Sequence, residues 1–402
     1  MLHYFDSFLA RRLGPTDDVQ AKNSKTRRIF LDVSAIKAHD AQTGIQRVVR
    51  ALVANIQCVA ESNLQICTVY ATVNGPYRLT NYFLSAEVFD RSVPEDVELE
   101  LGAGDIFLAL DLCAHILPLH ERQFVEWQRR GAVIAAVVYD LLPYSNPEWF
   151  SKKACKNFRR WLGLIGRRAD ILLPISEQVS NKVRDYMQRR HPDRAGFIKC
   201  EVLPLSGDIR ASRPTMGITK QERVLLKSLR DCPYVMAVGT VEPRKAHSKI
   251  LEAHRHLRAS RAQNCPFLIV VGKPGWKSKD TQRALEELSL EKDGALWLPA
   301  ASDELLDLLY RNCVGLIAAS FDEGYCLPVA EALAYHKPVL ARDIPIFREF
   351  DDILIRYFQR DDPVSLSLEI ERMASLLPTP SISVLKGWDM SAEALLAAVV
   401  RR

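Results

Sequence analysis

Residues 315–343 read GLIAASFDEGYCLPVAEALAYHKPVLARD, and this pattern decides the fold. The apolar runs at residues 315–320 and 338–343 predict two buried strands. Between them, FDEGYCLP predicts a loop and the residues that follow predict a helix, with Pro328 suited to its first position. A strand, a loop, a helix and a second strand in this order are typical of a parallel sheet.

The same alternation of apolar runs and amphipathic stretches recurs along the chain. Further runs that predict strands are RIFLDVSA (28–35), QICTVYATV (65–73), DIFLALD (105–111), AVIAAVVYD (132–140), ILLPIS (171–176), YVMAVG (234–239) and FLIVVG (267–272). The rhythm lapses between about Leu205 and Arg230, which indicates a connection between two units. We therefore expect an α/β protein with two Rossmann-like, doubly wound domains that face a central cleft.

The expected segments are a basic N-terminal segment (1–28), an N-terminal domain (29–208), a linker (209–230), a C-terminal domain (231–386) and a final helix (387–402). A helix after the first strand has the clearest pattern, because its apolar residues recur at helical spacing from Ile45 to Ile56. This periodicity predicts its buried face and places Arg47 and Arg50 elsewhere.

Composition narrows the class of protein. The 402 residues are 48% hydrophobic and 26% charged with a net charge of +5, which fits an ordinary globular protein and gives no indication of nucleic-acid binding. The nine cysteines are scattered singly, which argues against a disulfide framework or a zinc site and favours a cytoplasmic location. The first 28 residues hold six Lys/Arg and three Asp, so they would suit either an anionic membrane surface or an ordinary surface helix.

Two places combine a strand end with features that suit phosphate. Gly239 ends a predicted strand, and Arg244 and Lys245 follow where the next helix should begin, so cations and a helix N-terminus would act together. Gly44 lies in TGIQRVVR between a strand and a helix, where it would let an anion approach the backbone. Solvated surface cations and a glycine needed only for the turn remain alternatives.

Residues 315–343 contain two glutamates at positions that suit a ligand. Glu323 lies in the loop and Glu331 in the first turn of the helix, so both should face the carboxyl edge of the sheet. Carboxylates accept hydrogen bonds from pairs of hydroxyl groups, and this arrangement would offer one acid to each of two polyols. The alternative is structural, with Glu331 interacting with the helix dipole and Glu323 on a loop surface.

Several motifs together resemble retaining GT-B glycosyltransferases of glycosyltransferase family 4. The segments VGTVEPRKAH, FLIVVGKPGW, ASDELLDLLYRN and FDEGYCLPVAEALAYHKPVL are similar to the donor half of these enzymes. The segments FLDVSAIKAHDAQTGIQRVVRAL, VVYDLLPYSNPEWF and LLPISEQVS are similar to the acceptor half, especially in bacterial mannosyltransferases that build surface polysaccharides. The likeness runs from about Ile29 to the C-terminus.

The resemblance implies a role for each matching residue. Glu323 would contact the transferred sugar and Glu331 the ribose, while Arg244 and Lys245 would bind the diphosphate; we assign Glu323, Arg244 and Lys245 to catalysis. The remaining expected donor-binding residues are Gly44, Gly239, Thr240, Gly272, Leu298, Gly324, Tyr325, Cys326 and Leu327. On the acceptor or sugar side we place Tyr139, Asp140, Ile45 and Arg47.

Three positions depart from the family pattern. Thr240 stands where many relatives have an arginine, Tyr139 where many have a histidine, and Cys326 where a glycine is usual. Arg244 and Lys245 would then neutralise the leaving group without the arginine. The resemblance also implies that the final helix packs back on the N-terminal domain.

The resemblance implies transfer of a hexose, with GDP-mannose as the first guess, to a glycan or lipid-linked acceptor in synthesis of lipopolysaccharide O-antigen, capsule or exopolysaccharide. We expect no cofactor and no metal, no nucleic-acid partner, and a cytoplasmic location that leaves open a peripheral contact with the inner membrane. The alternatives are a non-catalytic relative that binds a nucleotide sugar and a GT-B sugar epimerase or phosphorylase.

Overall fold

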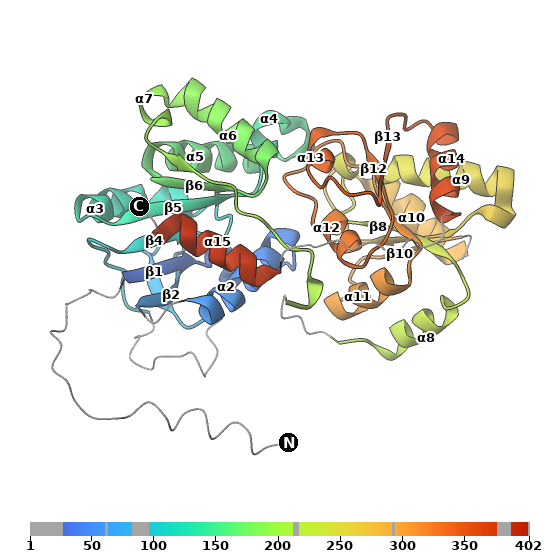
Figure 1. Ribbon diagram of the computed structural model, residues 1–402, viewed down its shortest axis with the longest axis horizontal. Helices are drawn as coiled ribbons and strands as arrows, with labels where there is room; N and C mark the ends of the chain where they lie inside the picture. Colours follow the sequence, from blue (N-terminus) through green and yellow to red (C-terminus); the bar gives the residue numbers. More distant parts are fainter. Residues whose placement is uncertain are drawn as a thin grey trace, which may run out of the picture.

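The computed structural model describes residues 27–60, 63–82, 96–211, 217–291, 294–375 and 387–400. Most of the predicted basic segment, residues 1–26, lies outside the described residues. The described chain forms two α/β lobes that lie side by side (Figure 1). None of its helices is both long enough and apolar enough to cross a membrane.

The N-terminal lobe is built on a sheet that has seven strands in the described part of the chain, in the order β3-β2-β1-β4-β5-β6-β7. Its strands are β1 (Arg27–Asp32), β2 (Leu64–Tyr70), β3 (Arg78–Thr80), β4 (Ile106–Ala109), β5 (Val133–Val138), β6 (Ile171–Pro174) and β7 (Lys199–Cys200). All neighbouring strands pair in parallel except β2 and β3. The order reverses between β1 and β4, which creates a crevice at the carboxyl ends of these strands.

Helices cover this sheet and share one hydrophobic core with it. They are α1 (Ser34–Ala38), α2 (Gly44–Val59), α3 (Glu121–Arg129), α4 (Leu142–Ser145), α5 (Lys152–Arg168), α6 (Glu177–Arg190) and α7 (Pro192–Ala195). The predicted apolar face of α2 is buried, with Ile45 partly exposed at its start. Thr43 caps α2, because its hydroxyl accepts from the Gln46 N–H while the Gln46 side chain accepts from the Thr43 N–H.

The C-terminal lobe has a sheet of six strands within the described ranges, in the order β10-β9-β8-β11-β12-β13. They are β8 (Tyr234–Val238), β9 (Phe267–Val271), β10 (Ala295–Leu298), β11 (Gly315–Ala318), β12 (Val339–Arg342) and β13 (Ile355–Phe358). This is the doubly wound order in which the first strand, β8, neighbours the fourth, β11. Alternate residues along a strand enter different cores, as Tyr234 and Met236 do on one face and Val235 and Ala237 on the other.

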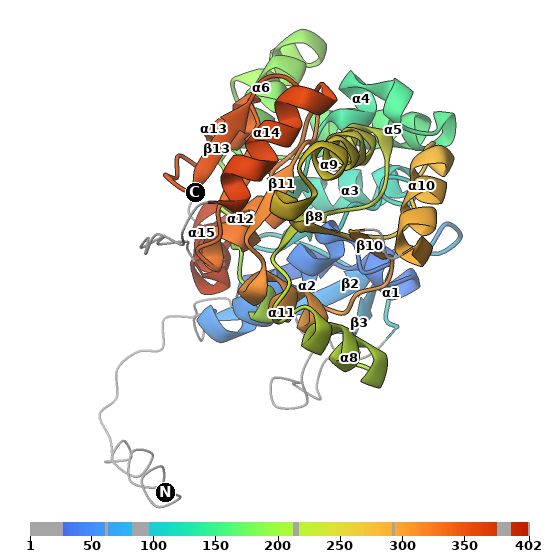
Figure 2. The same cartoon turned by 90° about the vertical axis from the view of Figure 1, so that its right-hand side faces the viewer.

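Helices cover both faces of this second sheet. They are α8 (Lys220–Ser228), α9 (His247–Arg261), α10 (Lys279–Glu291), α11 (Asp303–Asn312), α12 (Leu327–Ala334), α13 (Pro345–Arg348) and α14 (Pro363–Ala374). Figure 2 shows α9 and α14 side by side, and both contribute to the core that holds Val235. Helices α11 and α12 pack in the core on the opposite face.

The final helix, α15 (Trp388–Val400), joins the core of the N-terminal lobe and packs on α2. The indole N–H of Trp388 donates to the carbonyl of Asp208 at 2.8 Å, which ties the helix to the connecting segment. The chain therefore crosses from the N-terminal lobe to the C-terminal lobe and returns.

The prediction of two doubly wound α/β domains is confirmed, and the predicted strand segments all contain a strand. Four short strands were not predicted from the sequence, namely β3, β7, β10 and β13. All four lie at or near a sheet edge, where a strand needs only one hydrogen-bonded neighbour and a few residues.

Candidate functional site

A cavity of about 620 Å³ lies between the two lobes. The segments that line it follow the carboxyl ends of β5, β6, β8, β9, β10 and β11, together with the start of α2. The predicted site residues that line it are Gly44, Ile45, Arg47, Tyr139, Asp140, Gly239, Thr240, Arg244, Lys245, Gly272, Glu323, Gly324, Tyr325, Cys326, Leu327 and Glu331. Parallel sheets place ligand sites at this edge, so the fold itself concentrates these residues.

Glu323 forms the centre of a charged cluster with Arg244 and Lys245. Its Oε2 accepts from Arg244 at 2.7 Å and its Oε1 pairs with the ammonium of Lys245. Glu323 is 6% exposed, and burial opposes its ionisation. Arg244 and Lys245 outweigh burial and lower the pKa of Glu323 to about 2, so this carboxylate is charged at neutral pH.

The strand order explains why this cluster forms. Arg244 and Lys245 follow β8 in a short 3-10 turn, Pro243–Lys245, and Glu323 follows β11. Because β8 and β11 are neighbours in the sheet, their following loops meet at its carboxyl edge. The backbone N–H of Phe321 donates to the carbonyl of Arg244 at 2.8 Å, which fixes the two loops to each other.

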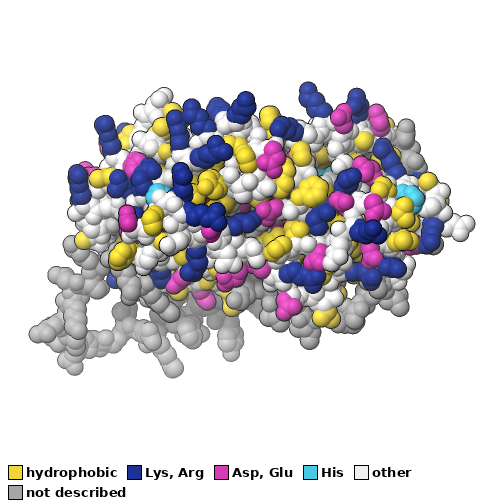
Figure 3. Space-filling model, turned by 90° about the horizontal axis from the view of Figure 1, so that it is seen from above, with side chains coloured by type: hydrophobic (Ala, Val, Ile, Leu, Met, Phe, Trp, Pro, Cys, Tyr) yellow, Lys and Arg dark blue, Asp and Glu magenta, His cyan; other side chains and the backbone are white. Residues whose placement is uncertain are grey.

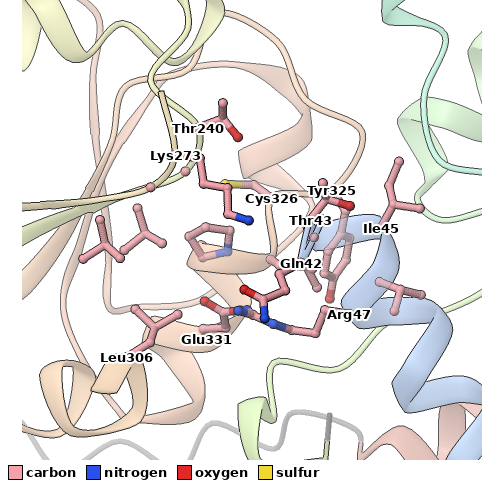
Figure 4. A pocket seen from close by; sticks show the side chains of 18 of the residues that line it. Gln42, Thr43, Ile45, Arg47, Thr240, Lys273, Leu306, Tyr325, Cys326 and Glu331 are labelled. Carbon is pink, nitrogen blue, oxygen red and sulfur yellow. The ribbon is translucent and has the colours of Figure 1, made fainter. Parts of the chain in front are cut away.

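Glu331 makes a separate cluster on the same cavity. It is 1% exposed and accepts from the Tyr310 hydroxyl at 2.9 Å. Its other oxygen pairs with the guanidinium of Arg47, which also donates to Asp303 at 2.5 Å. Burial raises the pKa of Glu331 above its ordinary range, and Arg47 opposes this rise. Figure 4 shows Arg47 and Glu331 pointing toward each other from the two lobes.

Arg47 lies away from the buried face of α2, as predicted, and it lines the cavity. Helical periodicity placed it away from the buried face of α2, and we assigned it to the acceptor or sugar side. In the structure it crosses the cavity to two acids of the C-terminal lobe, Asp303 and Glu331. A pattern within one helix does not show that a second domain covers the other face of that helix.

Cys326 precedes α12 with φ 75° and ψ 73°, a left-handed conformation that suits glycine better than cysteine. Its side chain is 8% exposed, and burial raises the pKa of the thiol to about 12, so the thiol is neutral. Next to it, the Tyr325 hydroxyl donates to the carbonyl of Leu205 at 2.9 Å. The loop that carries Glu323 is thereby anchored to the end of the N-terminal lobe.

Tyr139 differs from its expected role. Its hydroxyl donates to the carbonyl of Leu110 at 2.8 Å, and its ring belongs to the core of the N-terminal lobe. Its backbone meets Gly324, where a β-carbon would lie 2.0 Å from the Tyr139 carbonyl oxygen. Asp140 remains beside the charged cluster, and burial raises its pKa although Arg244 opposes the rise. The two lobes therefore touch through backbone at Tyr139 and Gly324.

The glycines of the C-terminal lobe allow close packing of loops. A β-carbon on Gly272 would lie 2.0 Å from the Gly239 carbonyl oxygen. Leu298 does not line the cavity; its carbonyl accepts from the Gly272 N–H at 3.0 Å, and the lining begins at the next residue, Pro299. By contrast, a β-carbon on Gly44 would meet Leu327 Cδ1 at an ordinary 3.4 Å.

The sequence analysis missed Asp303 and Tyr310, the other residues that hold Arg47 and Glu331. Asp303 begins α11 and reads as an acid at a helix N-terminus, while Tyr310 lies on the apolar face of the same helix. Only the packing of α11 beside α12 brings Asp303 to the cavity and Tyr310 to Glu331. Among the described residues, no three of His, Cys, Asp and Glu are grouped in a way that could hold a metal ion.

Comparisons with known proteins identify a family domain in this chain and the fold that it shares. Residues 220–350 match the family described as Glycosyl transferases group 1. The chain is 32% identical over 388 residues to "Serotype-specific mannosyltransferase WbdA" of Escherichia coli, covering 94% of this chain and 46% of that protein. It is 24% identical over 264 residues to "O-antigen chain mannosyltransferase RfbU" of Salmonella typhimurium, covering 65% of this chain and 64% of that protein. The chain thus spans about half the length of the WbdA relatives that it matches.

Solved structures share the architecture at low sequence identity. Anabaena Alr3699/HepE, crystallised in complex with UDP and glucose, aligns with a TM-score of 0.57 and 15% identity over 92% of this chain and 94% of that one. Sucrose-phosphate synthase of Thermosynechococcus elongatus aligns with a TM-score of 0.57 and 14% identity, over 93% and 95% of the two chains. The chain therefore contains a glycosyl transferases group 1 domain, at residues 220–350, within a GT-B fold of two parallel-sheet domains.

Proposed function

We propose that this chain is a retaining glycosyltransferase of family 4 that moves a hexose from a nucleotide diphosphate sugar to a glycan or lipid-linked acceptor in surface-polysaccharide synthesis. The observation that carries this proposal is the buried cluster of Glu323, Arg244 and Lys245 in the cavity between two GT-B domains. GDP-mannose is the first candidate donor, supported by the similarity to relatives that are named mannosyltransferases.

The cluster supplies what the departing diphosphate needs. Arg244 and Lys245 place two positive charges at the carboxyl edge of the sheet, and both side chains are largely buried in the cavity. Fixed cations of this kind stabilise developing negative charge without reorganisation, which is commonly a large share of catalysis. The N-terminus of α12 points backbone N–H groups to the same region.

Glu323 serves this reaction as a hydrogen-bond acceptor. Its low pKa keeps it ionised at neutral pH, so it accepts from sugar hydroxyls and holds both cations in position rather than donating a proton. On this proposal Glu331 binds the ribose, and the acceptor hydroxyl attacks from the face of the leaving group.

A donor screen tests the proposal. The purified chain is incubated with GDP-mannose and other nucleotide diphosphate hexoses, with and without polysaccharide or lipid-linked acceptors, and released nucleoside diphosphate is measured. We expect Glu323→Gln to lower turnover about 100- to 1,000-fold. Glu286→Gln is the matched control, because Glu286 is an exposed glutamate of α10 in the same lobe and does not line the cavity. Equal turnover in Glu323→Gln and the control would contradict the site assignment.

The same assay separates the remaining alternatives. A donor that binds but gives no product with any acceptor indicates a non-catalytic relative. A sugar whose configuration changes without transfer to an acceptor indicates an epimerase. Release of a sugar phosphate indicates a phosphorylase.

Arg244 and Lys245 supply the positive charge, so we expect the turnover measured in EDTA to stay within about twofold of the turnover without it. A loss of turnover in EDTA that added Mg²⁺ or Mn²⁺ restores would contradict metal independence. The anomeric configuration of the product, read by NMR, tests retention.

A further inference from the structure

Helix α5, Lys152–Arg168, carries seven Lys/Arg and no Asp or Glu. The surrounding residues 151–200 hold 13 Lys/Arg and 4 Asp/Glu, a net charge of +9. Since the whole chain has a net charge of +5, all other residues together have a net charge of −4. The positive charge of this protein is therefore concentrated in one segment of the N-terminal domain.

The cations of α5 face solvent. Its apolar residues, among them Phe158 and Trp161, are buried in the core of the domain. Five exposed cations lie in its first half, namely Lys152, Lys153, Lys156, Arg159 and Arg160, and Arg167 is exposed near its end. Within the described ranges, none of these five side chains forms a hydrogen bond or an ion pair, whereas Arg167 and Arg168 at the helix end both pair with Glu121.

These five cations do not stabilise the helix on which they lie. Lys152 and Lys153 occupy its first turn, where the helix dipole disfavours positive charge. Lys152 and Lys156, and then Lys156 and Arg160, are four residues apart, a spacing at which like charges repel. Helix stability therefore gives no reason for this arrangement.

The positive surface continues from α5 onto α6 and α7. Arg194 of α7 donates to the carbonyls of Gly166 at 2.9 Å and Ala169 at 2.8 Å, which holds α7 against the end of α5. Arg190 ends α6 at an exposed position, and Phe197 follows α7 with 88% of its surface exposed. Figure 3, seen from the side that carries these helices, shows many Lys and Arg side chains over the N-terminal lobe and others over the C-terminal lobe. We call α5, the end of α6, α7 and Phe197 the basic face.

We propose that the basic face docks the protein on a bilayer of anionic phospholipids, with Phe197 entering the interface. A helix of 17 residues extends about 25 Å, so its cations span many headgroups rather than one phosphate. Each Lys or Arg close to an anionic leaflet contributes about 1 kcal/mol, or roughly a fivefold factor in partitioning, and an exposed aromatic ring adds an apolar anchor. None of these residues lines the cavity, so the proposal concerns a different surface from the sugar-transfer site.

Vesicle binding by the full chain tests this proposal. Sedimentation with vesicles of phosphatidylglycerol and phosphatidylethanolamine is compared with vesicles of phosphatidylcholine, at low and high NaCl. We expect binding only to the anionic vesicles and a decrease as salt rises, because surface charges are screened. The triple variant Lys152→Gln, Lys153→Gln, Lys156→Gln should lose about 100-fold in partitioning. Phe197→Ser should lose a smaller factor and become no less stable to heat.

The matched control removes the same charge from the other domain. Lys220→Gln, Arg223→Gln and Lys227→Gln on α8 change three exposed cations and should leave vesicle binding within about threefold of the unmodified chain. Equal losses in both triple variants would show a net-charge effect and overturn the basic face as the docking surface. Tight binding of a DNA duplex that the α5 variant loses, without vesicle binding by the unmodified chain, would overturn the lipid assignment. Nucleotide release by the same variants is measured separately, so a failed docking proposal is distinguished from a failed transferase proposal.

Discussion

Arg47 of α2 and Glu331 of α12 form an ion pair across the cavity, so one guanidinium of the N-terminal domain neutralises the acid that we assign to the ribose. Asp303 shares the same guanidinium at 2.5 Å. Both acids belong to the C-terminal domain, and this contact joins the two domains directly. A ribose that binds Glu331 would take over part of this hydrogen bonding.

Arg47→Met should lower the free energy of unfolding by about 3 kcal/mol, because it leaves Glu331 buried without a cation. Arg50→Met is the control on the same helix, since Arg50 pairs with the half-exposed Asp40 and should cost less than about 1 kcal/mol. Urea unfolding of the two variants and the unmodified chain measures this difference. Similar losses in both variants would refute the cross-domain role of Arg47.

Gly324→Ala should separate the domains, because its β-carbon would lie 2.0 Å from the Tyr139 carbonyl oxygen. We expect a loss of about 2–3 kcal/mol in thermal or urea unfolding. Gly44→Ala offers a contrast, since its β-carbon would make an ordinary contact at 3.4 Å and should leave stability unchanged. If a diphosphate approaches the backbone at Gly44, Gly44→Ala lowers the affinity for nucleoside diphosphate and keeps the fold. An unchanged affinity would show that this glycine is needed only for the turn.

His247 should make the protein less stable in mild acid. Burial, together with Lys245 and Arg244, lowers its pKa to about 3, whereas an unfolded histidine titrates near pH 6.5. Between these values the unfolded chain binds one more proton at this residue than the folded chain, so this stability is present above pH 6.5 and is lost as pH falls.

The loss due to His247 amounts to about 1.4 kcal/mol for each pH unit below 6.5. Urea unfolding at pH 7 and pH 5 measures it. In His247→Gln the difference between the two pH values should shrink by about 2 kcal/mol, whereas His115→Gln, at an exposed position, should leave it unchanged. An unaltered pH dependence in His247→Gln would show that this side chain is not buried in its neutral form.

Cys326 should tolerate glycine better than valine. Its φ of 75° costs a side chain about 1–2 kcal/mol, and a β-branched residue is the least suited to this region. We expect Cys326→Gly to unfold within about 1 kcal/mol of the unmodified chain and Cys326→Val to lose about 2 kcal/mol or more. Thermal unfolding decides between them, and a valine variant as stable as the glycine variant would be incompatible with the left-handed backbone at this residue.

The sequence by itself determined the two doubly wound domains, and every residue that the sequence analysis assigned to the site, except Leu298, lines the cavity. Short, continuous apolar runs predict strands, because a strand of a parallel sheet is buried on both faces. Residues that follow β8 and β11 then lie at the same edge, because all strands of this sheet are parallel. Local patterns placed Glu323, Arg244 and Lys245 at strand ends, and the family resemblance assigned them to one site.

Tertiary structure alone decided what crosses between the domains. Arg47 reaches Glu331, the Tyr139 ring turns into a core, and Tyr310 supports an acid on a neighbouring helix. The Arg47–Glu331 contact depends on how the two domains pack, and the other two contacts depend on how separate elements pack within one domain. None of the three has a periodic signal in the sequence. The seven cations of α5 are visible in the sequence, but only the structure shows that its apolar side is buried and that the five cations of its first half are exposed.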